Sequence, residues 1–122
     1  MIQLRSVLIP ADNTGAKRLY VIGIKPGSKR KFGYLADIVN CVVNKAEPNG
    51  VVKDGEKVLA VVVRTKKETR RTDGSYIRFD DNAAVVIDKD KNPRGTRIFG
   101  PIAKEVKDKG FNRIASMAQE VV

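Results

Sequence analysis

Short apolar segments alternate with turn residues along the chain, about every ten residues. Segments that are rich in Val and Ile and bounded by Gly, Pro, Asn or Asp are typical of β-strands. ADNTGA at 11–16 is typical of a tight turn, and PNG at 48–50 and DG at 54–55 mark two further turns. The first three predicted strands cover residues 5–9, 18–24 and 37–46. The pattern therefore indicates an ordered β-rich fold.

Residues 58–79, VLAVVVRTKKETRRTDGSYIRF, predict a hairpin with two unlike halves. An apolar run, Val58 to Val63, is followed by a basic segment, and Asp73-Gly74 is typical of a two-residue type I′ turn. Such a turn fixes the strand register, although a bulge would shift it by one residue. The predicted pairs are Ala60–Ile87, Val61–Val86, Val63–Ala84, Lys66–Asp81, Lys67–Asp80, Thr69–Arg78, Arg70–Ile77 and Arg71–Tyr76. Because the tip has no apolar face, we expect it to project from the fold as a two-stranded ribbon.

The C-terminal third has the spacing of short helices. Pro101 suits a first helical position, Ile102 and Val106 lie four residues apart, and Gly110 suits the position just past a helix end. Apolar residues from 111 to 118 predict a second helix packed over the strands. Too few strands are present for a sandwich, and a closed barrel leaves no exposed strand edges. We therefore predict one mainly β domain over residues 1–122: a small closed five-stranded β-barrel with a projecting β-ribbon and two short C-terminal helices.

Charge is the strongest signal in the composition. Twenty-four Lys and Arg against fourteen Asp and Glu give a net charge of +10, which favours a polyanionic partner. Nucleic acid is the first candidate and an anionic membrane surface the second. No apolar run approaches the roughly 20 residues that a membrane span needs, and MIQLRSVLIPADN does not resemble a signal or transit peptide. We expect nucleic acid rather than a membrane to be the partner.

Several residue types that enzymes use are missing. Histidine is absent, which removes the commonest general base and metal ligand. The single Cys41 lies in an alternating strand pattern and is expected to be a small buried residue rather than a reactive thiol. Of the neighbouring carboxylates Asp80, Asp81, Asp88 and Asp90, the last two alternate with Lys and the first two are expected to pair with lysines across the hairpin, which disfavours a metal-dependent phosphodiesterase. No phosphate-binding loop or dinucleotide fingerprint is present, so we expect no catalysis, cofactor or metal.

Most of the candidate nucleic-acid contacts are cationic. Arg side chains suit bidentate phosphate binding, and Lys side chains act as point charges. The ribbon candidates are Arg64, Lys66, Lys67, Arg70, Arg71 and Arg78; those outside it are Lys17, Arg18, Ser28, Lys29, Arg30 and Lys31. Phe32 and Tyr34 are available for sugar or base contacts. Aromatic residues make up only 6% of the chain, which favours a structured nucleic acid over the alternative, a free-standing single-strand-binding barrel.

The longest motifs resemble one family. AVVVRTKKETRRTDGSYIRFDDNAAVVI, GTRIFGP and ADNTGA are similar to the universal large-subunit ribosomal protein number fourteen, in its bacterial or organellar form, almost from end to end. The resemblance implies a five-stranded barrel that binds large-subunit ribosomal RNA as a structural constituent of a cytoplasmic or organellar ribosome. Family members commonly have Gly in place of Glu68, Pro in place of Thr72 and Gly in place of Ala36.

The resemblance also implies protein partners. One face of such proteins meets the large-subunit proteins numbered three and nineteen, and small-subunit RNA in intersubunit bridges. A ribosome silencing factor docks on the bridge side in some members. The residues that correspond to this contact surface are Arg94, Thr96, Arg97 and Lys104.

Overall fold

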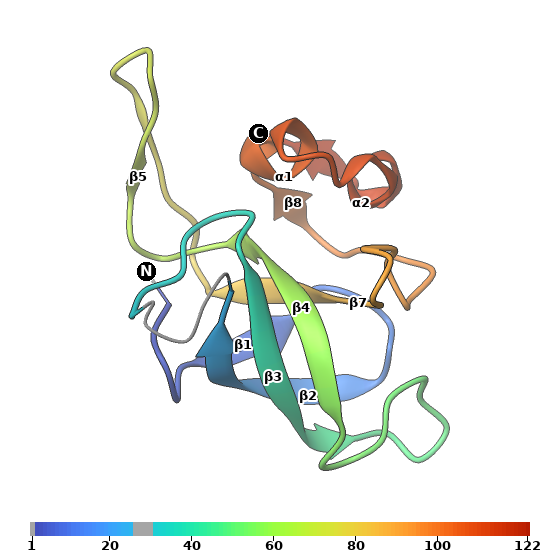
Figure 1. Cartoon of the computed structure of the whole chain (residues 1–122). Helices are drawn as coiled ribbons and strands as arrows, with labels where there is room; N and C mark the ends of the chain where they lie inside the picture. The colour runs from blue at the N-terminus through green and yellow to red at the C-terminus, as the bar shows by residue number, and fades with distance from the viewer. Residues whose placement is uncertain (1, 26–30) are drawn as a thin grey trace.

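The computed structural model describes residues 2–25 and 31–122, and its largest unit is a closed barrel (Figure 1). Its five strands are β1 (Val7–Pro10), β2 (Ala16–Ile24), β3 (Ile38–Ala46), β4 (Lys57–Arg64) and β7 (Ala83–Ile87). Neighbours along the order β1-β2-β3-β4-β7 are antiparallel, and a parallel β1–β7 pair closes the barrel. The predicted five-stranded barrel is confirmed, and Cys41 is buried on β3 as expected.

Two hydrophobic cores share the wall formed by β4 and β7. Alternate residues, such as Val62 and Val86, point into the barrel and pack against β2 and β3. The residues between them, such as Val63 and Val85, pack outward against the C-terminal segment, including Ile114. This second core explains why Val58 to Val63 form an unbroken apolar run instead of alternating with polar residues.

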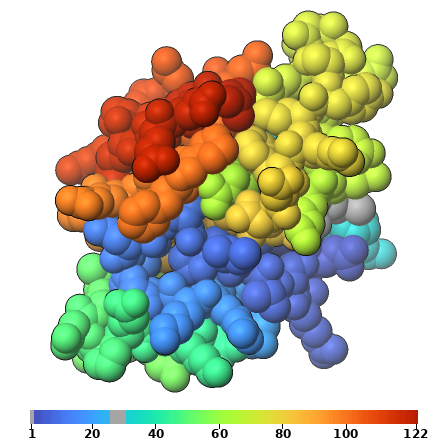
Figure 2. Space-filling view, turned by 180° about the vertical axis from the view of Figure 1, so that it is seen from behind, coloured from blue at the N-terminus to red at the C-terminus, as the bar shows by residue number. Residues whose placement is uncertain are grey.

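The basic hairpin leaves the barrel as a separate ribbon, formed by β5 (Thr69–Arg70) and β6 (Tyr76–Ile77). Figure 1 shows it projecting beside the C-terminal segment, and Figure 2 shows it standing out from the same corner when seen from behind. The predicted ribbon is therefore confirmed.

The predicted register of the hairpin is wrong by one residue. Ala60 pairs with Val86 and Val61 with Val85 in the barrel, and Arg70 pairs with Tyr76 in the ribbon. The cause is a three-residue loop: the amide of Arg71 donates to Ser75 O over 2.8 Å, and the amide of Gly74 donates to Arg71 O over 3.0 Å. Gly74 has a φ of 89°, as the last residue of such a loop requires. The pairing is locally irregular where the ribbon joins the barrel, with a register shift between Val62 and Arg64.

The C-terminal segment contains both predicted helices, α1 (Lys104–Asp108) and α2 (Asn112–Met117). Pro101 does not begin the first helix; it lies in β8 (Pro101–Ile102), which pairs in parallel with β9 (Glu120–Val121). Proline at the start of a short strand sacrifices no ladder hydrogen bond, so its sequence signal fits both positions. Gly110 follows the last turn of α1 with a φ of 96°, as predicted. Within the described part of the chain, no helix is long and apolar enough to cross a membrane.

Candidate nucleic-acid interface

The ribbon presents a group of exposed cations. Its strands continue β4 and β7, so the barrel wall holds its base, and the turn amides of Arg71 and Gly74 close its tip. Lys66, Arg70 and Arg78 form no ion pair with any residue that the structure describes. Free guanidinium and ammonium groups on a projecting two-stranded element are suited to contacting phosphates from both sides.

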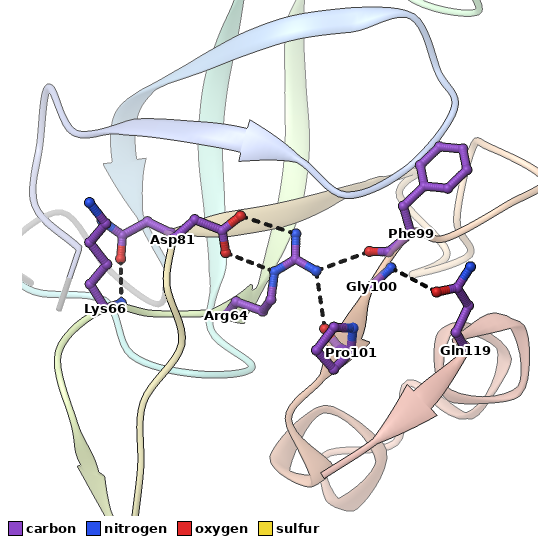
Figure 3. Close-up of polar contacts among 8 residues, drawn as sticks. Arg64, Lys66, Asp81, Phe99, Gly100, Pro101 and Gln119 are labelled. Atoms are coloured by element: carbon purple, nitrogen blue, oxygen red, sulfur yellow. Dashed lines mark hydrogen bonds and ion pairs between the residues drawn. The ribbon is translucent and has the colours of Figure 1, made fainter.

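Arg64 differs from the other predicted ribbon cations because its side chain is buried. Its Nε lies 3.0 Å from Asp81 Oδ1, and its Nη1 donates to the carbonyl oxygens of Phe99 and Pro101 over 3.0 and 3.2 Å (Figure 3). Only 9% of the residue is exposed. The structure therefore places Arg64 inside the fold, where it joins β4 to β8.

Arg71 braces the ribbon against the C-terminal segment. Its Nη2 donates to Glu105 Oε1 on α1 over 2.9 Å and to the main-chain oxygen of Val122 over 2.7 Å. The side chain of Arg71 is only 17% exposed. Of the two adjacent arginines in the sequence, Arg70 thus points to solvent and Arg71 fixes the direction of the ribbon.

The predicted pairs of Lys66 with Asp81 and Lys67 with Asp80 are wrong. Asp81 pairs with Arg64, the amide of Lys66 donates to Asn82 Oδ1 over 2.9 Å, and Lys67 Nζ lies 3.1 Å from Glu68 Oε1. Residues 65–68 and 78–82 lie between the barrel strands and the ribbon strands, so no regular strand pairing sets these lysines opposite the aspartates. Lys66 and Lys67 are exposed.

The cations outside the ribbon lie at two ends of the barrel. Lys31 is exposed in the segment before β3, at the end from which the ribbon leaves. Lys17 and Arg18 are exposed at the start of β2, which pairs with the end of β3 and so lies at the other end of the barrel. Ser28, Lys29 and Arg30 lie outside the described residues.

Residues 93–101 return from β7 along the barrel to β8, and a network of short contacts holds them. Asn13 accepts from the amides of Thr96 and Arg97 over 2.8 and 3.1 Å, and its Nδ2 donates to Thr96 Oγ1 over 2.8 Å. The side chains of Arg97 and Lys104 remain exposed. Sequence reasoning missed this link, although ADNTGA and GTRIFGP each carried a short polar residue beside a Gly, the usual signal of a side-chain-capped turn.

The guanidinium of Arg94, another candidate contact, is already bound to other residues of the chain. Its Nη1 lies 2.8 Å from Glu56 Oε2, and its Nη2 donates to Val51 O over 3.3 Å. Hydrogen bonds from Arg94 and from the amide of Lys53 lower the pKa of Glu56, so this pair is charged at neutral pH. Arg94 thus links residues 93–101 to the loop before β4.

Outside the candidate interface, the described carboxylates do not form a metal site. Among the described residues, no three Asp, Glu, Cys or His side chains gather where they could hold a metal ion. Asp12 is the buried carboxyl of the turn motif ADNTGA. Burial raises its pKa, while Thr14 Oγ1 and the amide of Val86 donate to it over 2.8 and 2.9 Å. These hydrogen bonds join the first turn to β7, which is a structural role.

The comparison with protein families agrees with this arrangement. The family model described as ribosomal protein L14p/L23e matches residues 1–122, the whole of the sequence. That span includes the barrel, the ribbon and the two C-terminal helices. The chain therefore belongs to the ribosomal protein L14p/L23e family and is a structural protein of the large ribosomal subunit.

Proposed function

We propose that the chain binds large-subunit ribosomal RNA through its ribbon and the basic segment before β3, without catalysis. The observation that carries the proposal is the set of exposed ribbon cations, Lys66, Arg70 and Arg78, none of which pairs with a described carboxylate. When such charges neutralise RNA phosphates, the counterions condensed on the RNA are released, which favours binding.

The barrel acts in this proposal as a rigid mount. The ribbon strands continue two barrel strands, and Arg71 holds the ribbon against α1. An isolated two-stranded ribbon is marginally stable in water, so this bracing fixes its cations before RNA arrives. Lys17 and Arg18, at the other end of the barrel, would contact a separate RNA segment. Neutralising both segments would let neighbouring RNA helices pack closely.

Filter binding to folded large-subunit RNA over a salt series tests the proposal. We expect steep salt dependence, and replacing Arg70 and Arg78 with Ala should lower the log–log slope by about 0.7–0.9 for each phosphate that the variant no longer neutralises. The matched control replaces Lys53 and Lys89, exposed lysines away from the ribbon, with the same change in net charge. An RNA affinity that does not change with salt concentration, or an equally reduced slope in both variants, would contradict the proposal. An oligo-dT competitor should displace the RNA poorly, since single-strand binding depends on stacking.

We also propose that the chain contacts other ribosomal components. Val7, Ile9, Tyr20 and Ile22 form an exposed apolar area on the outer faces of β1 and β2, and Val7 pairs with Tyr20 across the two strands. This area supports contact with neighbouring large-subunit proteins, and those that meet members of this family are the proteins numbered three and nineteen. Arg94, Thr96, Arg97 and Lys104 would face small-subunit RNA, or a ribosome silencing factor where one exists.

Subunit reassociation on sucrose gradients tests the bridge contact. Large subunits that carry Arg97→Glu should join small subunits less completely, because a carboxylate would then face RNA phosphates. Subunits with Lys53→Glu carry the same charge change on another loop and should associate normally. Normal association of the Arg97 variant would remove this surface from the bridge.

A further inference from the structure

A small cavity opens where the ribbon leaves the barrel. Its volume is about 240 Å³, and it is lined by Tyr34, Thr65, Lys67, Glu68, Thr69 and Arg70. Pockets that enclose drug-sized ligands measure about 300–1,000 Å³, so this one suits a single small planar group. In Figure 1, the segment that leads into β3 passes beside the end of β4, where the ribbon begins.

Tyr34 forms one wall of the cavity on a fixed backbone. Its amide donates to Asp37 Oδ2 over 2.7 Å, and the preceding residue, Gly33, exchanges two backbone hydrogen bonds with Ile2. Ala36 and Asp37 are in turn hydrogen-bonded to Val62 on β4. The tyrosine is nevertheless 48% exposed. An exposed aromatic ring on an ordered backbone is the usual platform for stacking an unpaired base.

The residues that line the cavity from the base of the ribbon include a donor and an acceptor side by side. Lys67 Nζ lies 3.1 Å from Glu68 Oε1, and Thr65 Oγ1 donates to Lys67 O over 3.0 Å, which fixes the turn. A hydrogen bond from its own amide and the neighbouring Lys67 lower the pKa of Glu68, so its carboxylate is ionised at neutral pH. Both side chains are about half exposed, at 60% and 48%, and can reach a ligand.

We propose that this cavity accepts one unpaired base of the bound RNA, stacked on Tyr34, and that Glu68 makes it prefer guanine. The inference rests on the proposed RNA binding and names what this part of the surface recognises. The Watson–Crick edge of guanine presents O6 as an acceptor beside the N1–H and N2–H donors. The Lys67 ammonium matches O6, and the Glu68 carboxylate can accept from both nitrogens.

Other bases fit this pair less well. Adenine offers its amino group to the carboxylate but has no second adjacent donor. Uracil places a carbonyl oxygen on each side of its N3–H, so one oxygen would face the negative charge of Glu68. Arg70, an exposed residue that also lines the cavity, can hold the phosphate of whichever nucleotide enters.

Chemical-shift mapping of ¹⁵N-labelled protein tests the proposal, with GMP, AMP and inorganic phosphate as probes. GMP should shift the amides of Tyr34, Thr65 and Thr69 and bind about fivefold or more tightly than AMP. Inorganic phosphate should shift Arg70 and leave Tyr34 unchanged. Equal responses to GMP and AMP, or shifts that avoid these residues, would overturn the proposal.

Two pairs of variants separate stacking from edge recognition. Tyr34→Ala should weaken GMP and AMP alike by about tenfold, whereas Tyr34→Phe should bind both normally. Glu68→Gln should bring the two affinities together, because an amide offers one acceptor in place of two. Asp80→Asn makes the same charge change at an exposed residue that does not line the cavity, and it should keep the preference for GMP. A preference that survives Glu68→Gln would exclude base reading by this residue.

Filter binding of the same variants to large-subunit RNA keeps the two proposals distinct. Glu68→Gln should retain salt-dependent RNA binding, because it removes no cation. If the unmodified protein binds RNA normally but shows no preference for GMP, the base site alone is refuted. Absence of salt-dependent RNA binding in the unmodified protein would refute the proposed function, and the nucleotide titrations would still decide whether the cavity reads guanine.

Discussion

The guanidinium of Arg64 lies against Gly100, in the space that a side chain at position 100 would need. A Cβ atom there would meet Arg64 Nη1, the atom that binds the carbonyl oxygens of Phe99 and Pro101. Gly100 also has a φ of 78°, a left-handed conformation. Gly100, the second Gly of GTRIFGP, is therefore required twice, once by its own backbone and once by the arginine that packs on it.

Gly100→Ala should destabilise the fold strongly. The left-handed conformation costs a residue with a Cβ about 1–2 kcal/mol, and displacing Arg64 leaves polar partners unpaired at about 1–3 kcal/mol. We expect the free energy of unfolding to fall by roughly 2–5 kcal/mol in total. Urea denaturation measures this as a lower midpoint with an unchanged slope.

Gly55→Ala is the matched control. Gly55 has a φ of 81°, but nothing lies within 4 Å of the position that its Cβ would occupy. This variant should be destabilised only by the backbone strain, about 1–2 kcal/mol. Equal destabilisation at both positions would show that Arg64 yields to the new methyl group at little cost.

Arg71→Ala should loosen the ribbon. The side chain is the contact through which the ribbon reaches Glu105 and Val122, so its removal frees the strand pair to open. Hydrogen exchange should accelerate about tenfold at the ribbon amides of residues 71 and 74, for a contact that contributes about 1.4 kcal/mol. Arg70→Ala makes the same charge change at the neighbouring residue and should leave these exchange rates unaltered.

Lys91→Gly should stabilise the fold. The loop from Asp88 to Asn92 repeats the hydrogen bonds of the ribbon tip: the amide of Asp88 donates to Asn92 O over 2.9 Å, and that of Lys91 donates to Asp88 O over 3.1 Å. Lys91 therefore stands where the ribbon tip has Gly74, with a φ of 65°. Relief of this strain outweighs the added freedom of the unfolded chain, for a net gain of about 0.5–1 kcal/mol.

The comparison for that gain is Lys91→Ala, which removes the charge and keeps the Cβ atom. Its free energy of unfolding should stay within about 0.5 kcal/mol of that of the unmodified protein, since Lys91 is exposed. If Ala stabilised as much as Gly, charge rather than backbone strain would be the cause.

Cys41 should resist thiol reagents in the folded protein. Burial in the barrel raises the pKa of its thiol to about 12, so almost no thiolate exists at a pH of about 8. Modification with a chromogenic disulfide should be slow in buffer, complete in strong denaturant, and limited to one site per chain. Rapid labelling in buffer would mean that β3 opens locally, without unfolding of the barrel.

The sequence predicted the barrel well because most of its strands carry short β-branched segments between recognisable turns. It could not determine the β4–β7 register, because both strands are buried on both faces and a slip of one residue still sets apolar side chains opposite each other. The Asp73-Gly74 pair fits both a two-residue and a three-residue loop. Only the structure distinguishes these alternatives, through the amides of Arg71 and Gly74.

The candidate interface was predictable as a region but not residue by residue. Arg64, Arg70 and Arg71 belong to one basic run, yet the first is buried, the second exposed and the third half-buried. Their partners lie 17 to 51 residues away, beyond any local pattern; they are Asp81, Glu105 and the main chain of Phe99, Pro101 and Val122. Arg64 had one local signal, its position directly after Val63 and within the strand.

The wall shared by two cores also determines which parts of the hairpin tolerate amino-acid substitution. Each residue from Val58 to Val63 fills space on one side of the wall or the other, so these positions accept only apolar residues of similar size. Thr72 to Ser75 are exposed and make only local contacts at the ribbon tip. One continuous hairpin therefore combines a half in which most substitutions should destabilise the fold with a tip whose exposed side chains can be replaced at little cost.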